Sequence, residues 1–147
     1  MCAALLSKRG SVVRINQLIS VAVLLLGSSA ALAGLVQPAP VSVTLFSTGG
    51  GRATGDMVTA RFSKDSVAFL GCGVRRIYSI DGSFGVFGFC EARTSSGVSG
   101  TCFSEDPALI ESLASISDYS FIVFTWNASG TCTSIGNSTQ SVYIPDK

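Results

Sequence analysis

The chain has 147 residues, of which 47% are hydrophobic, with ten Lys and Arg, nine Asp and Glu, and no histidine. Without an imidazole that titrates near neutrality, the chain has no Ser-His-Asp or Cys-His catalytic centre, no histidine-ligated zinc and no histidine pH switch. A length near 150 residues indicates one domain.

The first 33 residues have the pattern of a secretory signal peptide. Three basic residues within positions 1–16 precede an apolar run over 18–26, and Ala31-Leu32-Ala33 supplies small residues for cleavage. A transmembrane anchor is disfavoured, because a span needs about 20 apolar residues and small residues interrupt this run early. We predict cleavage after Ala33 and no membrane span in the mature protein.

The mature chain has a different charge from the whole chain. Removal of 33 of the 147 residues leaves 114, with seven basic and nine acidic side chains and a net charge of −2. Proteins that bind nucleic acid normally cluster Lys and Arg against the phosphates. The mature chain has one adjacent basic pair, Arg75-Arg76. We expect no nucleic-acid partner.

Four cysteines remain in the mature chain: Cys72, Cys90, Cys102 and Cys132. An even number in an exported chain predicts two disulfides, because oxidising compartments let these bonds persist. Their spacings of 18, 12 and 30 residues contain no C-x-x-C, the motif of zinc and thioredoxin-like sites. We therefore expect no metal and no cofactor.

Hairpin symmetry leaves the disulfide pairing open. Cys72 and Cys90 are equidistant from Asp81, whereas Cys90 and Cys102 are equidistant from Ser96, and Cys90 bonds only once. We expect Cys90–Cys102 with Cys72–Cys132, since this pairing also ties the early hairpin to the last strand.

The first part of the mature chain is expected to be extended. Residues 34–40 contain two prolines and are expected to form a linker. Residues 41–46 alternate β-branched and polar side chains and predict a strand. The Gly-rich residues 47–56 predict a loop that is free to contact a partner, and residues 57–62 predict a second strand.

The middle of the chain is expected to form hairpins. Strands at 67–70 and 74–80 flank a predicted bulge at the glycines of 71–73. Asp81-Gly82 predicts a type I′ turn. Returning strands follow at 84–90 and, after a turn at 95–97, at 98–103.

One helix is expected, with Asp106 as its N-cap and Pro107 in the first helical position. Residues 119–126 form the most apolar stretch of the mature chain and predict a central strand covered on both faces. One or two strands are expected at 132–135 and 140–144. The fold class is therefore mainly β with one short helix: a small disulfide-bonded β-sandwich or α+β roll of six to eight short strands, spanning 41–147.

Few motifs carry chemistry. The glycines of 50–55 resemble a phosphate-binding loop, but Asp56-Met57 stands where Lys and Ser or Thr are needed. Carboxylates are the remaining acid–base candidates: Glu91, Glu105, Asp106 and Glu111. We interpret them as helix-capping and surface residues and expect no catalytic residue. Six aromatic residues could line a ligand groove, but β alternation favours core packing, and we expect them in the core: Phe84, Phe87, Phe89, Phe121, Phe124 and Trp126. Asn127 and Asn137 fit the N-glycosylation pattern and are expected in exposed turns.

The C-terminal half carries a recurring pattern of cysteines, turns and strand residues. Its features are Cys90-Glu91-Ala92-Arg93, Gly97-Val98, Cys102, Asp106-Pro107-Ala108-Leu109, Asp118-Tyr119-Ser120, Phe124-Thr125-Trp126-Asn127, Gly130-Thr131-Cys132-Thr133 and Tyr143-x-Pro145. In these features the chain resembles a group of small, uncharacterised exported bacterial proteins. The resemblance implies bacterial export and a shared disulfide scaffold, and it brings no activity.

These observations together predict an exported, non-enzymatic binding or structural protein in the periplasm or extracellular space. Its partner is expected to be an envelope or extracellular protein or a glycan. One alternative is an inhibitor of a secreted hydrolase, because small disulfide-bonded β domains suit the insertion of a rigid loop. Another is a carboxylate-dependent hydrolase acting on cell-wall glycans, which would use two of the four candidate carboxylates.

Overall fold

The computed structural model describes residues 34–145, so the predicted signal peptide lies outside the described residues. Within them the chain is mainly β, as predicted, with seven strands, two α-helices and a final 3-10 turn. The elements are β1 (Ser42–Leu45), β2 (Gly51–Asp56), α2 (Met57–Arg61), β3 (Phe69–Tyr78), β4 (Phe84–Arg93), β5 (Ser99–Ser104), α3 (Pro107–Leu113), β6 (Ser120–Trp126), β7 (Cys132–Thr139) and η1 (Ser141–Tyr143).

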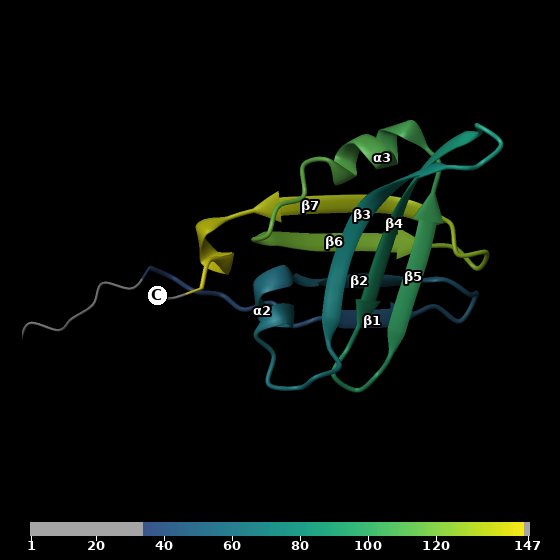
Figure 1. The fold of residues 1–147 in the computed structure, drawn as a ribbon. Coiled ribbons are helices and arrows are strands. Elements are labelled where there is room, and N and C mark those ends of the chain that lie inside the picture. Colours follow the sequence, from purple (N-terminus) through teal and green to yellow (C-terminus); the bar gives the residue numbers. More distant parts are fainter. Residues whose placement is uncertain (1–33, 146–147) are drawn as a thin grey trace, which may run out of the picture. The chain divides into compact units, whose positions relative to one another are not determined.

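The strands form two antiparallel sheets that lie across each other (Figure 1). One sheet has the order β1-β2-β6-β7, and the other has the order β3-β4-β5. Helix α3 contacts β7 of the first sheet and the β3–β4 pair of the second. The core lies between the sheets, because its buried residues come from strands of both.

Four hairpins share one turn geometry. In each, three residues separate two residues that are bonded across the turn, and the third of the three is a glycine with positive φ: Gly49, Gly82, Gly97 and Gly130. This is a type I turn followed by a glycine bulge. The predicted type I′ turn at Asp81-Gly82 is wrong, because Asp81 does not take a positive φ. Its carboxylate instead accepts the Ser83 N–H at 2.9 Å.

The segment 47–62 is the largest departure from the sequence prediction. Residues 51–56 form β2 rather than a loop, and residues 57–61 form α2 rather than a strand. Position 51 has no room for a side chain, because the indole of Trp126 lies against it. A Cβ there would approach Trp126 Cζ2 to 2.6 Å. Of the glycines that suggest a loop, Gly49 and Gly50 do lie in a turn, whereas Gly51 and Gly55 are buried residues of a strand.

Asp56 ends β2 and begins α2. Its carboxylate is buried and accepts the N–H of Thr59 as the helix N-cap and the N–H of Ala39, both at 2.6 Å. The Asp56 N–H also donates to Ala39 O, and the Gln37 N–H donates to Val142 O. Residues 34–40, predicted as a linker, have no regular secondary structure, but these bonds hold residues 37–39 against the domain.

Strands β3, β6 and β7 also differ in detail from the prediction. Strand β3 pairs with β4 in continuous register, so the bulge predicted at 71–73 is absent there. In β6 alternate residues are buried and half-buried, so one face, rather than both, lies in the core. Strand β7 runs unbroken over Cys132–Thr139, and η1 follows it, placing Tyr143 in a stack on Phe121 with ring centroids 5.7 Å apart.

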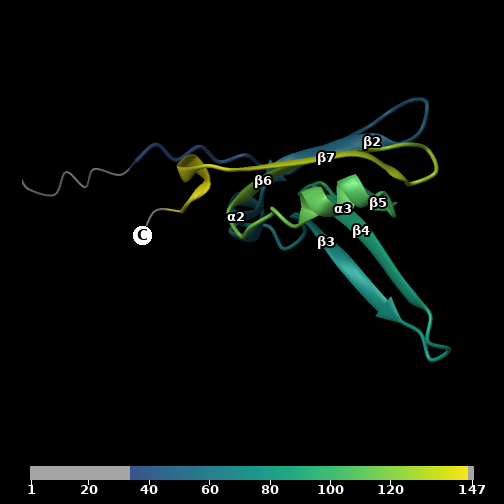
Figure 2. The same cartoon turned by 90° about the horizontal axis from the view of Figure 1, so that it is seen from above.

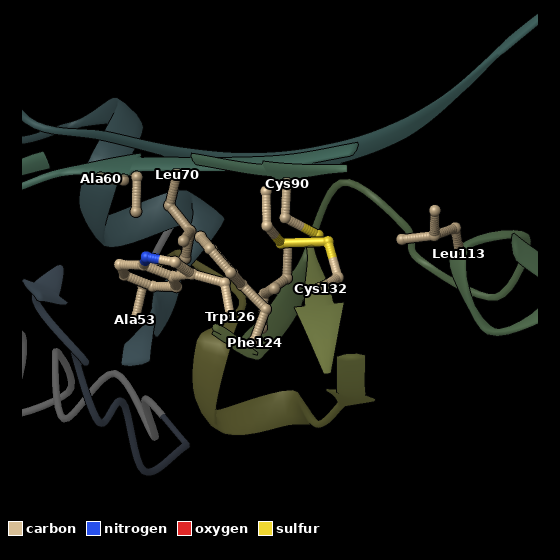
Figure 3. Close-up of a cluster of buried hydrophobic side chains, with 11 residues drawn as sticks. Ala53, Ala60, Leu70, Cys90, Leu113, Phe124, Trp126 and Cys132 are labelled. Carbon is tan, nitrogen blue, oxygen red and sulfur yellow. A yellow bond between two sulfur atoms is a disulfide. The ribbon is translucent and has the colours of Figure 1, made fainter. Parts of the chain in front are cut away.

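Trp126 fills the space between the sheets. Its ring lies beside that of Phe124, with centroids 5.4 Å apart (Figure 3). In the same view Leu70 and Cys90 reach toward these rings from the three-stranded sheet. Gly100 of β5 lies directly against the indole, and no side chain fits between them. The close approach of the two sheets therefore requires a glycine at this position.

The disulfides join Cys72 to Cys90 and Cys102 to Cys132. The predicted pairing, Cys90–Cys102 with Cys72–Cys132, is therefore wrong. Cys90 lies in register opposite both Cys72 and Cys102, which is why hairpin symmetry could not choose between them. The choice follows from β5, which meets the turn before β7 through the Phe103–Thr131 bridge and so brings Cys102 to Cys132.

Gly100→Ala is expected to destabilise the protein by about 1–3 kcal/mol, because the added methyl group overpacks the core against Trp126. Urea unfolding followed by Trp126 fluorescence measures this change. Gly71→Ala is the matched control, since a Cβ at Gly71 meets no atom within 4 Å. Equal stability of the two variants would contradict the packing described for Trp126.

An unreduced trypsin digest separates the two disulfide pairings. Cleavage after Lys64, Arg75, Arg76 and Arg93 is expected to give residues 65–75 joined to 77–93. Residues 94–147 are expected as a separate peptide closed by its own disulfide, because no basic residue lies between Cys102 and Cys132. A single species joining all three peptides in the mass spectrum would disprove the observed connectivity.

Candidate functional site

The four carboxylates singled out in the sequence differ in their structural surroundings. Asp106 caps α3, accepting the N–H groups of Ala108 at 2.8 Å and Leu109 at 3.3 Å. Glu111 is exposed on α3, and Glu91 is half-buried in β4, in register with Gly71 and Thr101. Glu105 is exposed just after β5 and borders a pocket described below. The capping role predicted for Asp106 is confirmed.

Asp65 organises the loop between α2 and β3. It accepts hydrogen bonds from the Ser63 hydroxyl and from the N–H groups of Val67 and Ala68. These bonds, the Ser63 hydroxyl first, lower the pKa of the Asp65 carboxyl below its ordinary value. The loop lines a cavity of about 450 Å³ beside α2. Since these bonds occupy its carboxylate, we assign Asp65 a structural role.

Among residues 34–145, no group of three His, Cys, Asp or Glu side chains is placed to hold a metal ion. No helix in this part of the chain is long and apolar enough to cross a membrane.

The predicted aromatic core divides into two groups. Phe124 and Trp126 are buried between the sheets as expected. Phe84 is exposed, and Phe87, Phe89 and Phe121 are only half-buried, so the prediction that they fill the core is wrong. Alternation along β4 turns Cys90 and Ala92 inward, and therefore turns Phe87 and Phe89 to the opposite face.

The outward-turned rings belong to an open surface on the three-stranded sheet. We call this surface the Phe–Arg face; its members are Phe69, Arg75, Phe87, Phe89, Arg93 and Phe103. Arg75 Cζ lies 4.5 Å from the Phe89 ring centroid, and Arg93 Cζ lies 5.4 Å from that of Phe69. The guanidinium groups thus lie over aromatic rings, a favourable electrostatic arrangement.

A pocket of about 510 Å³ borders this face. Its lining consists of Phe87, Phe103, Ser104, Glu105 and Thr131. The ring centroids of Phe87 and Phe103 are 6.0 Å apart with planes inclined by 59°. The pocket therefore combines two aromatic walls with a carboxylate and hydroxyl groups.

The ends of β3 and β4 project from the body of the domain as a hairpin arm, residues 74–86 (Figure 2). Its exposed large apolar side chains are Val74, Ile77, Tyr78, Ile80 and Phe84. The rings of Tyr78 and Phe84 contact across the hairpin, with centroids 4.7 Å apart. The Cys72–Cys90 disulfide joins the two strands below the arm, which restricts splaying of the strands at its base.

The sequence favoured a core role for the aromatic residues over a ligand groove, and it did not predict the arm. It assigned the partner-contacting role to residues 47–56, but residues 51–56 form β2, in which four of the six residues are buried, and only 47–50 form an open turn. One signal for the arm was present: apolar residues continue up to the turn at Asp81-Gly82, beyond the length needed to cross the other sheet. Phe69 and Phe103 had no such signal, because alternation alone does not tell which face of a strand meets solvent.

The two predicted glycosylation sites differ in their surroundings. Asn127 lies in the exposed turn before β7, where its Oδ1 accepts the N–H groups of Ser129 and Thr131. Asn137 lies in β7, not in a turn, and is only half-exposed. Its Nδ2 donates to Ser112 O at 3.2 Å and Ser115 Oγ at 2.8 Å. The acceptor nitrogen of Asn137 is thus engaged in holding α3.

No family model, curated protein or solved structure matches this chain. The resemblance of its C-terminal half to exported bacterial proteins therefore stays a prediction.

Asp65→Asn is expected to lower the free energy of unfolding at neutral pH, because the amide replaces an anion that three donors stabilise. The lowered pKa of Asp65 means that this stabilisation is present above the ordinary carboxyl value of 3.8 and is lost as pH falls through the lowered value. The stability gap between wild type and variant should therefore narrow in acid, as followed by urea titrations between neutral and acidic pH.

The control is Asp118→Asn, which removes a carboxylate from the same cavity without opening the 63–68 loop. If the difference in unfolding free energy between wild type and Asp65→Asn is constant with pH, the loop does not depend on the ionised carboxylate.

Proposed function

We propose that this is an exported, non-enzymatic binding protein that docks onto a partner protein through its hairpin arm. The observation that carries the proposal is the arm itself: a projecting hairpin on which five of the ten exposed non-glycine residues are large and apolar. Large exposed apolar patches on soluble proteins are often binding sites. Tyr78 is 76% exposed and Ile80 is fully exposed, so both are free to enter a pocket on a partner.

Export is supported by the cysteine chemistry and by the N-terminal pattern. Two disulfides in a domain of this size are typical of oxidising compartments, and every cysteine of the mature chain takes part in one. The signal-peptide pattern of residues 1–33 points in the same direction. We place the protein in the periplasm or the extracellular space of a bacterium.

A second candidate function is inhibition of a secreted hydrolase. The observation that favours it is the support at the base of the arm, where a disulfide joins the strands at Cys72 and Cys90 and Leu113 of α3 packs against Gly88. A rigid hairpin enters an enzyme cleft with little loss of conformational entropy, which favours tight binding. A hydrolase role for this chain itself has less support, because Asp106 is occupied as a helix cap and Glu111 is exposed on α3.

The arm is tested by site-specific photo-crosslinking in cells that export the protein. A photo-reactive phenylalanine analogue at Tyr78 is expected to capture one defined protein, and Ile80→Ser should reduce the yield because it removes apolar contact at the tip. Phe62 is the matched control position, since it is 73% exposed but lies beyond α2, away from the arm.

Identical capture patterns from Tyr78 and Phe62, or no adduct at Tyr78, would refute the docking proposal. If the captured protein is a hydrolase, its activity is assayed with the purified domain added. A loss of activity that Ile80→Ser relieves would assign the inhibitor function, and unchanged activity would reject it.

A further inference from the structure

The pocket at Phe87, Phe103 and Glu105 has the features of a binding site for an organic cation. We infer that it receives an arginine side chain of the partner protein. This inference rests on the proposed function for the existence of a protein partner, but the site and its chemistry are argued from different residues.

The Phe–Arg face itself provides the precedent. Two of its four phenylalanines already bind a guanidinium of this chain: Arg75 lies over Phe89, and Arg93 lies over Phe69. Within residues 34–145 these are the cation–ring contacts, so the rings of Phe87 and Phe103 hold no cation from this part of the chain. They present the same chemistry to a cation from outside.

A negative charge accompanies these two free rings. Phe87 lies in register opposite Arg75, whose guanidinium lies over the Phe89 ring. On its other side β4 pairs Gly88 with Ser104, the last residue of β5, and Glu105 follows directly in the chain. Glu105 is exposed and lines the same pocket as both rings. A carboxylate beside aromatic faces attracts a cation and disfavours an anion. The net charge of −2 on the mature chain acts in the same direction at long range.

The pocket walls are held in place before any ligand arrives. The Phe103 N–H donates to Gly130 O at 3.0 Å, and Phe103 forms a bridge with Thr131. The Cys102–Cys132 disulfide links the neighbours of both residues. Phe103 is nonetheless 50% exposed, so its ring is accessible while its backbone is fixed. Preorganisation of this kind lowers the entropic cost of binding.

The chemistry of the pocket favours a guanidinium over an ammonium group. The Phe87 and Phe103 rings are inclined by 59° with centroids 6.0 Å apart, and they line the pocket beside the Glu105 carboxylate. A guanidinium is planar and weakly hydrated, and it pairs with a carboxylate through two parallel N–H bonds. A lysine ammonium is compact and strongly hydrated, so it gains less from leaving water for a ring face.

The place of the pocket suits a side chain of a docked protein. Phe87 directly follows the arm in the chain, so a partner bound to the arm lies next to the pocket. The arm would supply apolar contact, and the pocket would add a charged anchor that sets the partner's orientation. Arginine is among the residues that most often carry interface binding energy.

The test uses a small probe, so that it does not require the partner. The ¹⁵N-labelled exported protein, with its disulfides intact, is titrated with N-acetyl-arginine amide, and backbone chemical shifts are followed by NMR. The matched probe is N-acetyl-citrulline amide, which has nearly the same shape without the charge. Saturable shifts centred on Phe103, Glu105 and Thr131 are expected for arginine only, with weaker binding of N-acetyl-lysine amide.

Variants separate the roles of the rings and the carboxylate. Glu105→Gln and Phe103→Leu are each expected to weaken binding of the arginine probe by about two- to fivefold, the effect of one exposed cation contact. Phe103→Trp should tighten it, because indole is the strongest cation-binding ring. Phe69→Leu is the matched control, since it removes a ring of the same face whose cation is supplied internally, and it should leave the affinity unchanged.

Equal binding of arginine and citrulline probes, shifts centred elsewhere, or no saturable shift would overturn the cation site. This result is independent of the crosslinking at Tyr78. Probe binding without a captured partner would support the cation site and reject the docking function. A captured partner without probe binding would support the docking function and reject the cation site.

Discussion

The junction between β5 and the turn that leads into β7 is the contact on which the other features of the domain depend. There the Cys102–Cys132 disulfide, the Phe103–Thr131 bridge and the hydrogen bond from Phe103 to Gly130 join the two sheets within a few residues. Two residues before Cys102, Gly100 allows Trp126 to fill the gap between the sheets. The core, the pocket and the direction of the three-stranded sheet all follow from this junction.

The two disulfides have different mechanical roles. Cys102–Cys132 joins the sheets to each other, whereas Cys72–Cys90 joins neighbouring strands below the hairpin arm. The four-stranded sheet and α3 support the base of the three-stranded sheet, and the outer part of that sheet extends beyond them (Figure 2). Both candidate binding surfaces lie on the extended sheet, so the stability of the fold and its contact with partners are separated in space.

Local signals in the sequence predicted much of the fold. Asp106 followed by Pro107 placed the start of α3 correctly, and the apolar stretch at 119–126 placed β6. Local signals failed where a long-range contact decides the outcome. Gly51 of β2 has no room for a side chain because Trp126, 75 residues later in the chain, packs against it. Asp56 looked like a loop residue, but it is a buried cap that also holds Ala39.

The candidate binding surfaces were harder to predict, for a related reason. Phe124 and Phe87 both lie in alternating strands, yet one is buried and the other lines an open pocket. Alternation along a strand implies only that neighbouring side chains lie on opposite faces of the sheet. The packing of a second sheet decides which of the two faces is buried. The same limit applied to Cys90, which lies opposite a cysteine on each side.

The sequence by itself determined the mainly β composition, the turns after β3, β4 and β6, the capped helix α3 and the absence of histidine chemistry, because each depends on residue types or on neighbours close in the chain. Only the tertiary structure decided the disulfide partners, the exposed face of the three-stranded sheet and the projection of the arm. These depend on how two sheets pack, and that packing is set by contacts between residues far apart in the sequence.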